Sequence, residues 1–114
     1  MKHRRDFQRL FRSAWRARGP GFSVAVCPNG TPYTRLGLSV GKRCWRGAVG
    51  RNRVRRVFRE AFRLSLPRLP EGYDVLMIAY EPKLEPVLTE VQRHLVKLVR
   101  RAIEKGQERA REQA

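Results

Sequence analysis

The sequence predicts an α+β fold in a single domain, and three observations carry this prediction. The chain has 114 residues with a hydrophobic content of 41%, which is enough for one globular core. Apolar residues recur at helical spacing in some segments and at strand spacing in others. These segments follow one another in the order helix, strand, strand, helix, strand, helix.

The first helix is expected over residues 6–16, DFQRLFRSAWR, where five apolar residues share one helical face: Phe7, Leu10, Phe11, Ala14 and Trp15. Asp6 is a suitable N-cap, and Gly19 followed by Pro20 ends the helix. A first strand is expected over FSVAVC (22–27), because its residues are small or β-branched. The turn cluster PNGTP (28–32) comes next.

A second strand is expected over TRLGLSVG (34–41), where apolar residues strictly alternate with Arg35, Gly37 and Ser39. Its closeness in sequence to residues 22–27 predicts an antiparallel hairpin of these two strands. The third strand, YDVLMIAY (73–80), is mostly apolar, as in strands buried on both faces. The strand–helix–strand passage between residues 34 and 80 permits one parallel pairing.

The second helix is expected from about Ala48 to Leu66, before Pro67, and has two faces. One is apolar and predicts a core face: Val54, Val57, Phe58, Ala61 and Phe62. The opposite face is called here the arginine ridge, and it consists of Asn52, Arg55, Arg56, Arg59 and Arg63. The last helix is expected over 87–105, within one domain of residues 1–105, and the polar segment 106–114 is expected to fray.

The charge is strongly unbalanced, with 26 Lys and Arg against 10 Asp and Glu, for a formal net charge of +16. Such a surplus favours polyanionic partners, of which nucleic acid is the first candidate and an anionic membrane surface the second. The arginine ridge alone could be a solvated polar face. Arginine is, however, suited to bidentate phosphate contacts, and the preceding connector KRCWRG (42–47) adds Lys42, Arg43 and Arg46. The ridge is therefore predicted to contact nucleic acid.

Several other classes of protein are disfavoured. No stretch approaches the roughly 18 apolar residues of a membrane span, and the N-terminus is not that of a secretory signal. Cys27 and Cys44 lack C-x-x-C spacing, so neither a zinc site nor a disulfide framework is expected. His3 and His94 form no plausible pair with each other or with a carboxylate. We therefore expect no catalytic site, metal site or cofactor on the protein itself.

Four segments resemble the protein subunit of bacterial ribonuclease P: RRDFQRLFR, RLGLSVGKR, AVGRNRVRRVFREAFR and LPEGYDVLMIA. The resemblance covers about residues 4–104, and its RNR block, residues 51–53, is the most specific part. It implies a ribosomal-protein-like, two-layer α/β sandwich, in which three helices pack on a small mixed sheet with a left-handed strand–helix–strand crossover. The sequence departs from the family pattern at two positions. Gly50 stands where many relatives have a basic or bulky residue, and Ala25 stands where some have an aromatic or larger residue.

The resemblance further implies a function, the removal of the 5′ leader from precursor tRNA in the cytoplasm. The protein would bind the RNA subunit and the single-stranded leader, with no membrane and no protein partner required. Hydrolysis would be performed by the RNA subunit with Mg²⁺, and the protein would hold no cofactor. The alternative is a structural RNA-binding protein of ribosomal type. A helix-turn-helix DNA-binding protein is disfavoured because no short helix precedes residues 48–63.

Two sets of residues are assigned from this resemblance. The RNA-subunit-binding set is Lys42, Arg43, Arg46, Arg51, Asn52, Arg53, Arg55, Arg56, Arg59 and Arg63. The leader-binding set is Phe7, Phe11, Arg9, Arg12, Arg16 and Arg35. From spacing alone Phe7 and Phe11 would be core residues, whereas the resemblance implies rings partly open for stacking on bases. The small residues Gly37 and Ser39 on the outward face of their strand fit the floor of a groove for the leader, although a tightly packed helix would require the same residues.

Overall fold

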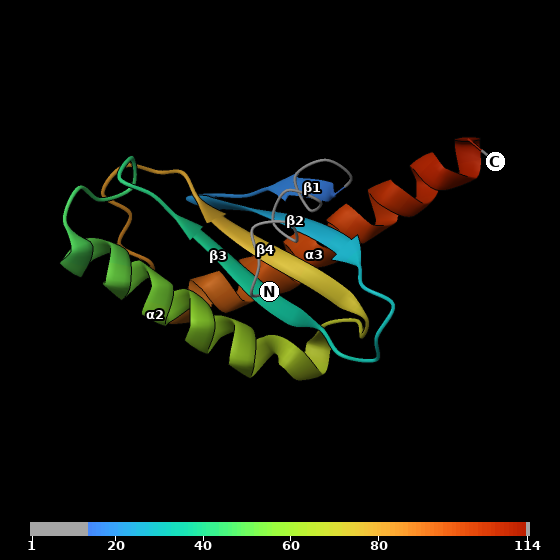
Figure 1. Cartoon of the computed structure of the whole chain (residues 1–114), viewed down its shortest axis with the longest axis horizontal. Helices are drawn as coiled ribbons and strands as arrows, with labels where there is room; N and C mark the ends of the chain where they lie inside the picture. Colours follow the sequence, from blue (N-terminus) through green and yellow to red (C-terminus); the bar gives the residue numbers. More distant parts are fainter. Residues whose placement is uncertain (1–13, 114) are drawn as a thin grey trace.

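The computed structural model describes residues 14–113, which form two layers (Figure 1). One layer is a four-stranded sheet of β1 (Trp15–Arg18), β2 (Phe22–Pro28), β3 (Arg35–Val40) and β4 (Tyr73–Ala79). The other layer contains α2 (Ala48–Ser65) and α3 (Leu88–Gln113), and the short 3-10 helix η1 (Leu66–Arg68) follows α2. The predicted α+β class and two-layer sandwich are confirmed. The helix expected to begin at Asp6 lies largely outside the described residues.

The sheet has the order β1-β2-β4-β3, with β4 antiparallel to β2 and parallel to β3. The expected hairpin between residues 22–27 and 34–41 is therefore wrong, because β4 lies between these strands. β4 is buried from Asp74 to Met77, and a central position gives such an apolar strand a partner on both sides. The parallel β3–α2–β4 passage is confirmed, whereas its left-handedness stays a prediction.

The prediction that the first helix extends to residue 16 is also wrong. Trp15 and Arg16 belong to β1, where they pair with Val26 and Ala25 of β2. β1 takes up the edge of β2 that would otherwise leave unpaired backbone groups, and it buries Ala17 in the core. Tertiary pairing thus overrides the helical spacing of the apolar residues in this segment.

The main core lies between the sheet and the two helices. Val24, Val26, Val75 and Met77 are fully buried on the sheet side. The predicted core face of α2 is confirmed, since Val54, Phe58, Ala61 and Phe62 are buried and Val57 is half-buried. One apolar face of α3 is buried as well, and its residues recur at helical spacing: Val91, Leu95, Leu98, Val99, Ala102 and Ile103. These two helices therefore present their remaining faces to the outside.

Helix α3 extends beyond the expected end at residue 105 and reaches Gln113, so residues 106–113 are helical (Figure 1). Gly106 is buried within this helix because the Trp15 side chain of β1 lies directly on it. A Cβ atom at Gly106 would lie only 1.8 Å from Cδ2 of Trp15. The contact fastens the C-terminal third of α3 to the sheet edge and explains why a glycine occupies a helical position.

Candidate nucleic-acid interface

Helix α2 exposes its arginines because its apolar residues face the sheet. Arg53, Arg56 and Arg59 are exposed, and none of them has an ion-pair partner among residues 14–113. Arg63 is also exposed, but it donates from Nε to Glu60 at 3.2 Å. This hydrogen bond lowers the pKa of Glu60 and raises that of Arg63. Three guanidinium groups on one helix thus carry positive charge that no carboxylate of residues 14–113 pairs with, and such a surplus favours an anionic partner.

Two other arginines of the predicted set are partly buried and bind backbone carbonyls. Arg51 donates from Nη1 to the carbonyls of Trp45 and Arg46, at 3.0 and 2.6 Å. Arg55 donates to Oδ1 of Asn52 at 3.0 Å and to the carbonyl of Val40 at 3.3 Å. Arg51 thus holds the connector against α2, and Arg55 ties α2 to the end of β3. Both have a structural task besides any contact with RNA.

The N-terminus of α2 adds to this positive surface. Gly47 is the N-cap without a side-chain hydrogen bond, and the first turn contains no acidic residue. The free amides and the helix dipole at such an end favour a phosphate. Lys42, Arg43 and Arg46 of the connector are exposed next to it. The connector, the helix end and the arginine ridge therefore form one basic surface.

The connector is held in place by Trp45. The indole Nε1 donates to the carbonyl of Leu84 at 2.7 Å, and the ring lies against Gly50. A Cβ atom at Gly50 would lie 2.6 Å from Cγ of Trp45, so no larger residue fits there without movement. This explains the departure noted at Gly50: the glycine admits the tryptophan that positions the connector.

Lys83 is a cation of this surface that sequence reasoning missed. Its backbone N–H donates to the carbonyl of Cys44 at 2.6 Å, which brings the loop after β4 to the connector. In the sequence Lys83 stands in a short loop between Pro82 and Pro86, and no periodic signal connects this loop to residues 42–47. Burial raises the pKa of the Cys44 thiol.

The predicted leader-binding residues are described only in part. Phe7, Arg9, Phe11 and Arg12 lie outside the described residues. Arg16 and Arg35 are on the sheet face opposite the helices, since each is in register with residues of that face: Ala25 for Arg16 and Asp74 for Arg35. They lie on strands at the two edges of the sheet. Their role toward a leader stays a prediction.

Between these two edges the sheet face is apolar and buried, so the predicted open floor of small residues is not found at Gly37. Gly37, Leu76 and Ala25 are in register across three strands, and all three are buried. Ala25 is completely buried, so having alanine here, where some relatives have a larger residue, does not alter the exposed surface.

Arg35 is engaged with Asp74 in a bidentate ion pair, with Nε–Oδ1 and Nη2–Oδ2 distances of 2.7 and 2.9 Å. Asn29 donates to the same Oδ1 atom at 3.1 Å. Burial of Asp74 favours the neutral acid, but the hydrogen bonds from Arg35 and Asn29 outweigh it and lower the pKa of Asp74. This network joins the N-terminal end of β3 to the N-terminal end of β4.

Replacement of Asp74 by Asn should lower the free energy of unfolding at pH 7 by about 1–2 kcal/mol, because charge-assisted hydrogen bonds to a half-exposed arginine are lost. The pKa of folded Asp74 lies below the ordinary 3.8, so its contribution is present above that pH and is lost as the pH falls further. In urea unfolding between pH 7 and 2.5, the free energy of unfolding should therefore fall less with decreasing pH in Asp74→Asn than in the parent. Glu71→Gln, at an exposed carboxylate, is the control; an identical acid loss in Asp74→Asn and the parent would contradict the assignment.

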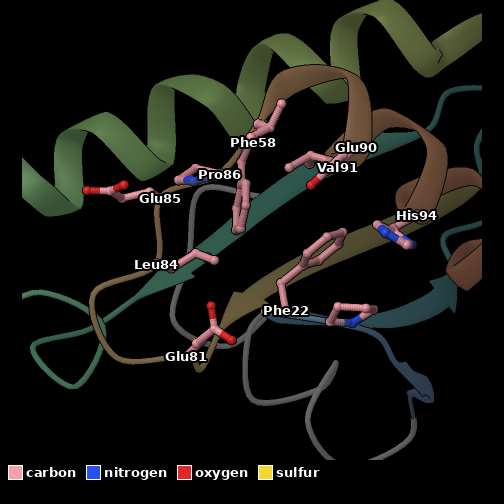
Figure 2. Close-up of a pocket in the computed structure, with 12 residues that line it drawn as sticks. Phe22, Phe58, Glu81, Leu84, Glu85, Pro86, Glu90, Val91 and His94 are labelled. Carbon is pink, nitrogen blue, oxygen red and sulfur yellow. The ribbon is translucent and has the colours of Figure 1, made fainter.

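An acidic pocket of about 180 Å³ lies at the start of β2 and α3 and is bounded by Phe58 on the core face of α2 (Figure 2). Phe22 and Phe58 line it, with ring centroids 5.2 Å apart. Glu81, Glu85 and Glu90 also line it. Carboxylates repel phosphate, so this pocket marks a boundary of the basic surface.

No helix of the described residues is long and apolar enough to cross a membrane.

Known proteins with a similar chain were found by sequence and by structure. The family model Ribonuclease P matches residues 1–103. The ribonuclease P protein component of Syntrophobacter fumaroxidans is 45% identical over 80 residues, which are 70% of this chain and 66% of that protein. The same component of Chloroflexus aggregans is 37% identical over 99 residues, covering 86% of this chain and 68% of that one.

Solved structures agree with this result. The RNase P protein from Thermotoga maritima superposes with a TM-score of 0.78 at 30% identity, covering 89% of this chain and 94% of that chain. The Staphylococcus aureus RNase P protein gives a TM-score of 0.76 at 29% identity, covering 90% and 93%. With a family model that spans nearly the whole sequence and a shared fold, this chain belongs to the ribonuclease P protein family.

Proposed function

We propose that this chain is the protein component of a ribonuclease P ribonucleoprotein and binds its RNA subunit through the basic surface of α2 and the connector. The observation that carries this proposal is the row of exposed arginines, Arg53, Arg56 and Arg59, without acidic partners among the described residues. Planar guanidinium groups along one helix suit the phosphates of a folded RNA. Membership in the family makes ribonuclease P RNA the RNA in question.

The opposite sheet face is proposed to carry the single-stranded 5′ leader of precursor tRNA. Arg16 and Arg35 stand on strands at its two edges, and both are exposed. Phe7 and Phe11 are proposed to stack on leader bases, each such contact contributing about 1–3 kcal/mol irrespective of sequence. The two RNA partners would then occupy different faces of one small protein.

The chemistry is proposed to reside in the RNA subunit, where bound Mg²⁺ would supply charge stabilisation for hydrolysis of the scissile phosphate. The protein would neutralise phosphate charge and hold the substrate. Because this electrostatic contribution substitutes for counterions, it should matter most when Mg²⁺ is scarce. We place this reaction in the cytoplasm.

The proposal is tested by cleavage of precursor tRNA with the cognate RNA subunit at low Mg²⁺, with and without this chain. We expect the chain to raise kcat/KM by at least about 10-fold, the equivalent of one or two retained phosphate or base contacts. A substrate with a single leader nucleotide should gain less than one with several. High Mg²⁺ should reduce the difference between reactions with and without protein.

Two controls make this result specific. A ribosomal protein of similar size and charge tests whether positive charge alone suffices, and it should give no leader-dependent gain. If this chain also gives no gain at low Mg²⁺ but binds structured RNA, the alternative of a structural RNA-binding protein is favoured instead.

A further inference from the structure

A second pocket, of about 320 Å³, lies between the connector and the loop after β4, beside the N-terminus of α2. Its apolar lining comes from Cys44, Trp45 and Pro82. Cys44 is buried and Trp45 is half-buried, and the hydrogen bond from Trp45 to Leu84 fixes the indole. The pocket is therefore built from positioned groups, and its aromatic residue is held by neighbours on two elements.

Four cations line the same pocket: Lys42, Arg43, Arg46 and Lys83. All four are exposed, and none has an ion-pair partner within the described part of the chain. Gly47 also lines it, and there the uncapped end of α2 adds its own positive potential. An apolar pocket surrounded by positive charge is complementary to a ligand with a flat apolar part and an attached anion.

The backbone conformation of Lys83 is consistent with a binding function for the pocket. Its φ is +55°, in the left-handed region that residues other than glycine adopt only at a cost of about 1 kcal/mol. The Lys83 N–H donates to the carbonyl of Cys44 at 2.6 Å, and this hydrogen bond closes one side of the pocket. A lysine in place of glycine keeps a cation at the rim despite the backbone cost.

We propose that this pocket receives one unpaired nucleotide of an RNA strand, with its base against Trp45 and its phosphate at the N-terminus of α2. The combination favours a nucleic acid strand over a phosphoserine peptide or a lipid headgroup, because neither of these has a flat ring for the indole to contact. The proposal rests on the proposed function and deepens it: the basic surface would hold folded RNA by phosphates and also capture a single base beside it.

The proposal is tested with the full chain and two single-stranded probes, hexauridylate and the same sugar–phosphate backbone with abasic positions. We expect hexauridylate to bind at least about 5-fold more tightly than the abasic probe, because a stacked base contributes that much or more. The chain contains two tryptophans, Trp15 and Trp45. Quenching of tryptophan fluorescence by hexauridylate should persist in Trp15→Phe and disappear in Trp45→Phe.

Lys83→Gly provides a variant that is safe for folding, because glycine accepts the positive φ. It should unfold no more easily than the parent, yet the slope of log affinity against log salt for either probe should fall by about 0.7, the value for one phosphate contact with a single strand. Lys105→Ala, which removes one exposed cation from α3, is the charge-matched control and should leave the slope unchanged.

Equal affinities for the two probes, or quenching that persists in Trp45→Phe, would overturn the pocket proposal. An acidic peptide that competes with hexauridylate as well as unlabelled hexauridylate does would also overturn it. These failures differ from a failure of the proposed function, which would appear as no binding of the RNA subunit and no gain in cleavage. An intact gain in cleavage together with quenching that persists in Trp45→Phe would reject the pocket alone.

Discussion

Simultaneous replacement of Arg56 and Arg59 by alanine should weaken binding to the RNA subunit by about 100-fold or more, because two charge-assisted hydrogen bonds to phosphates, each worth about 1.5–3 kcal/mol, are lost. Both side chains are exposed on α2 without an ion-pair partner in the described region, so the folded protein does not depend on them. The slope of log affinity against log salt should shrink by about 1.4–1.8, as expected for two phosphate contacts. Filter binding or fluorescence anisotropy over a series of salt concentrations measures both quantities.

The choice of these two arginines follows from the structure. Arg51 and Arg55 donate to backbone carbonyls of the connector and of β3, so their removal would disturb the protein as well as any RNA contact. Arg63 is already paired with Glu60. The matched control is Arg101→Ala with Lys105→Ala, which removes the same charge from exposed positions on α3. If both double variants lose affinity equally, net charge rather than the ridge binds the RNA.

The parts of this interface that the sequence predicts are those that depend on local spacing. The register of Val54 and Phe58 along one helix determines that Arg56 and Arg59 face outward, and no distant residue is needed for this inference. The proline at position 67 likewise places the end of α2 correctly. A resemblance to a known family then adds the partner, which local spacing does not contain.

The parts that sequence reasoning missed depend on contacts between distant segments. Strands 22–28 and 35–40 are separated in the sheet by β4, because a buried apolar strand takes the central position whatever its place in the chain. Trp15 fits a helical pattern with Phe11 in the sequence, yet its backbone pairs with Val26. The position of Lys83 beside Cys44 is likewise set by a loop contact, and neither residue shows a signal for it.

Gly106→Leu should be the most destabilising single change considered, lowering the free energy of unfolding by about 3 kcal/mol or more, because it overpacks a filled site. Cδ2, Cε2 and Cγ of Trp15 lie 1.8–2.2 Å from the position that a Cβ atom would take. These atoms belong to the base of a rigid indole, so the clash is relieved only by moving β1 or the C-terminal third of α3. Chemical denaturation followed by circular dichroism measures the change, with Gln107→Leu at a neighbouring exposed position as the control.

Gly106→Ala gives the sharpest form of this prediction, because helix propensity and packing act in opposite directions. At an open helical site the change from glycine to alanine stabilises by about 0.5–1 kcal/mol, whereas here the methyl group meets Trp15 and should destabilise by about 1–3 kcal/mol. In a Trp15→Ala background the same change should regain its stabilising sign, since the indole is gone. A double-mutant cycle over these two positions therefore reports their contact directly, and additive effects would mean that Trp15 does not lie on Gly106 in solution. The cycle also tests whether α3 is fastened to the sheet edge at Gly106, since only that contact makes a glycine at this position of α3 preferable to alanine.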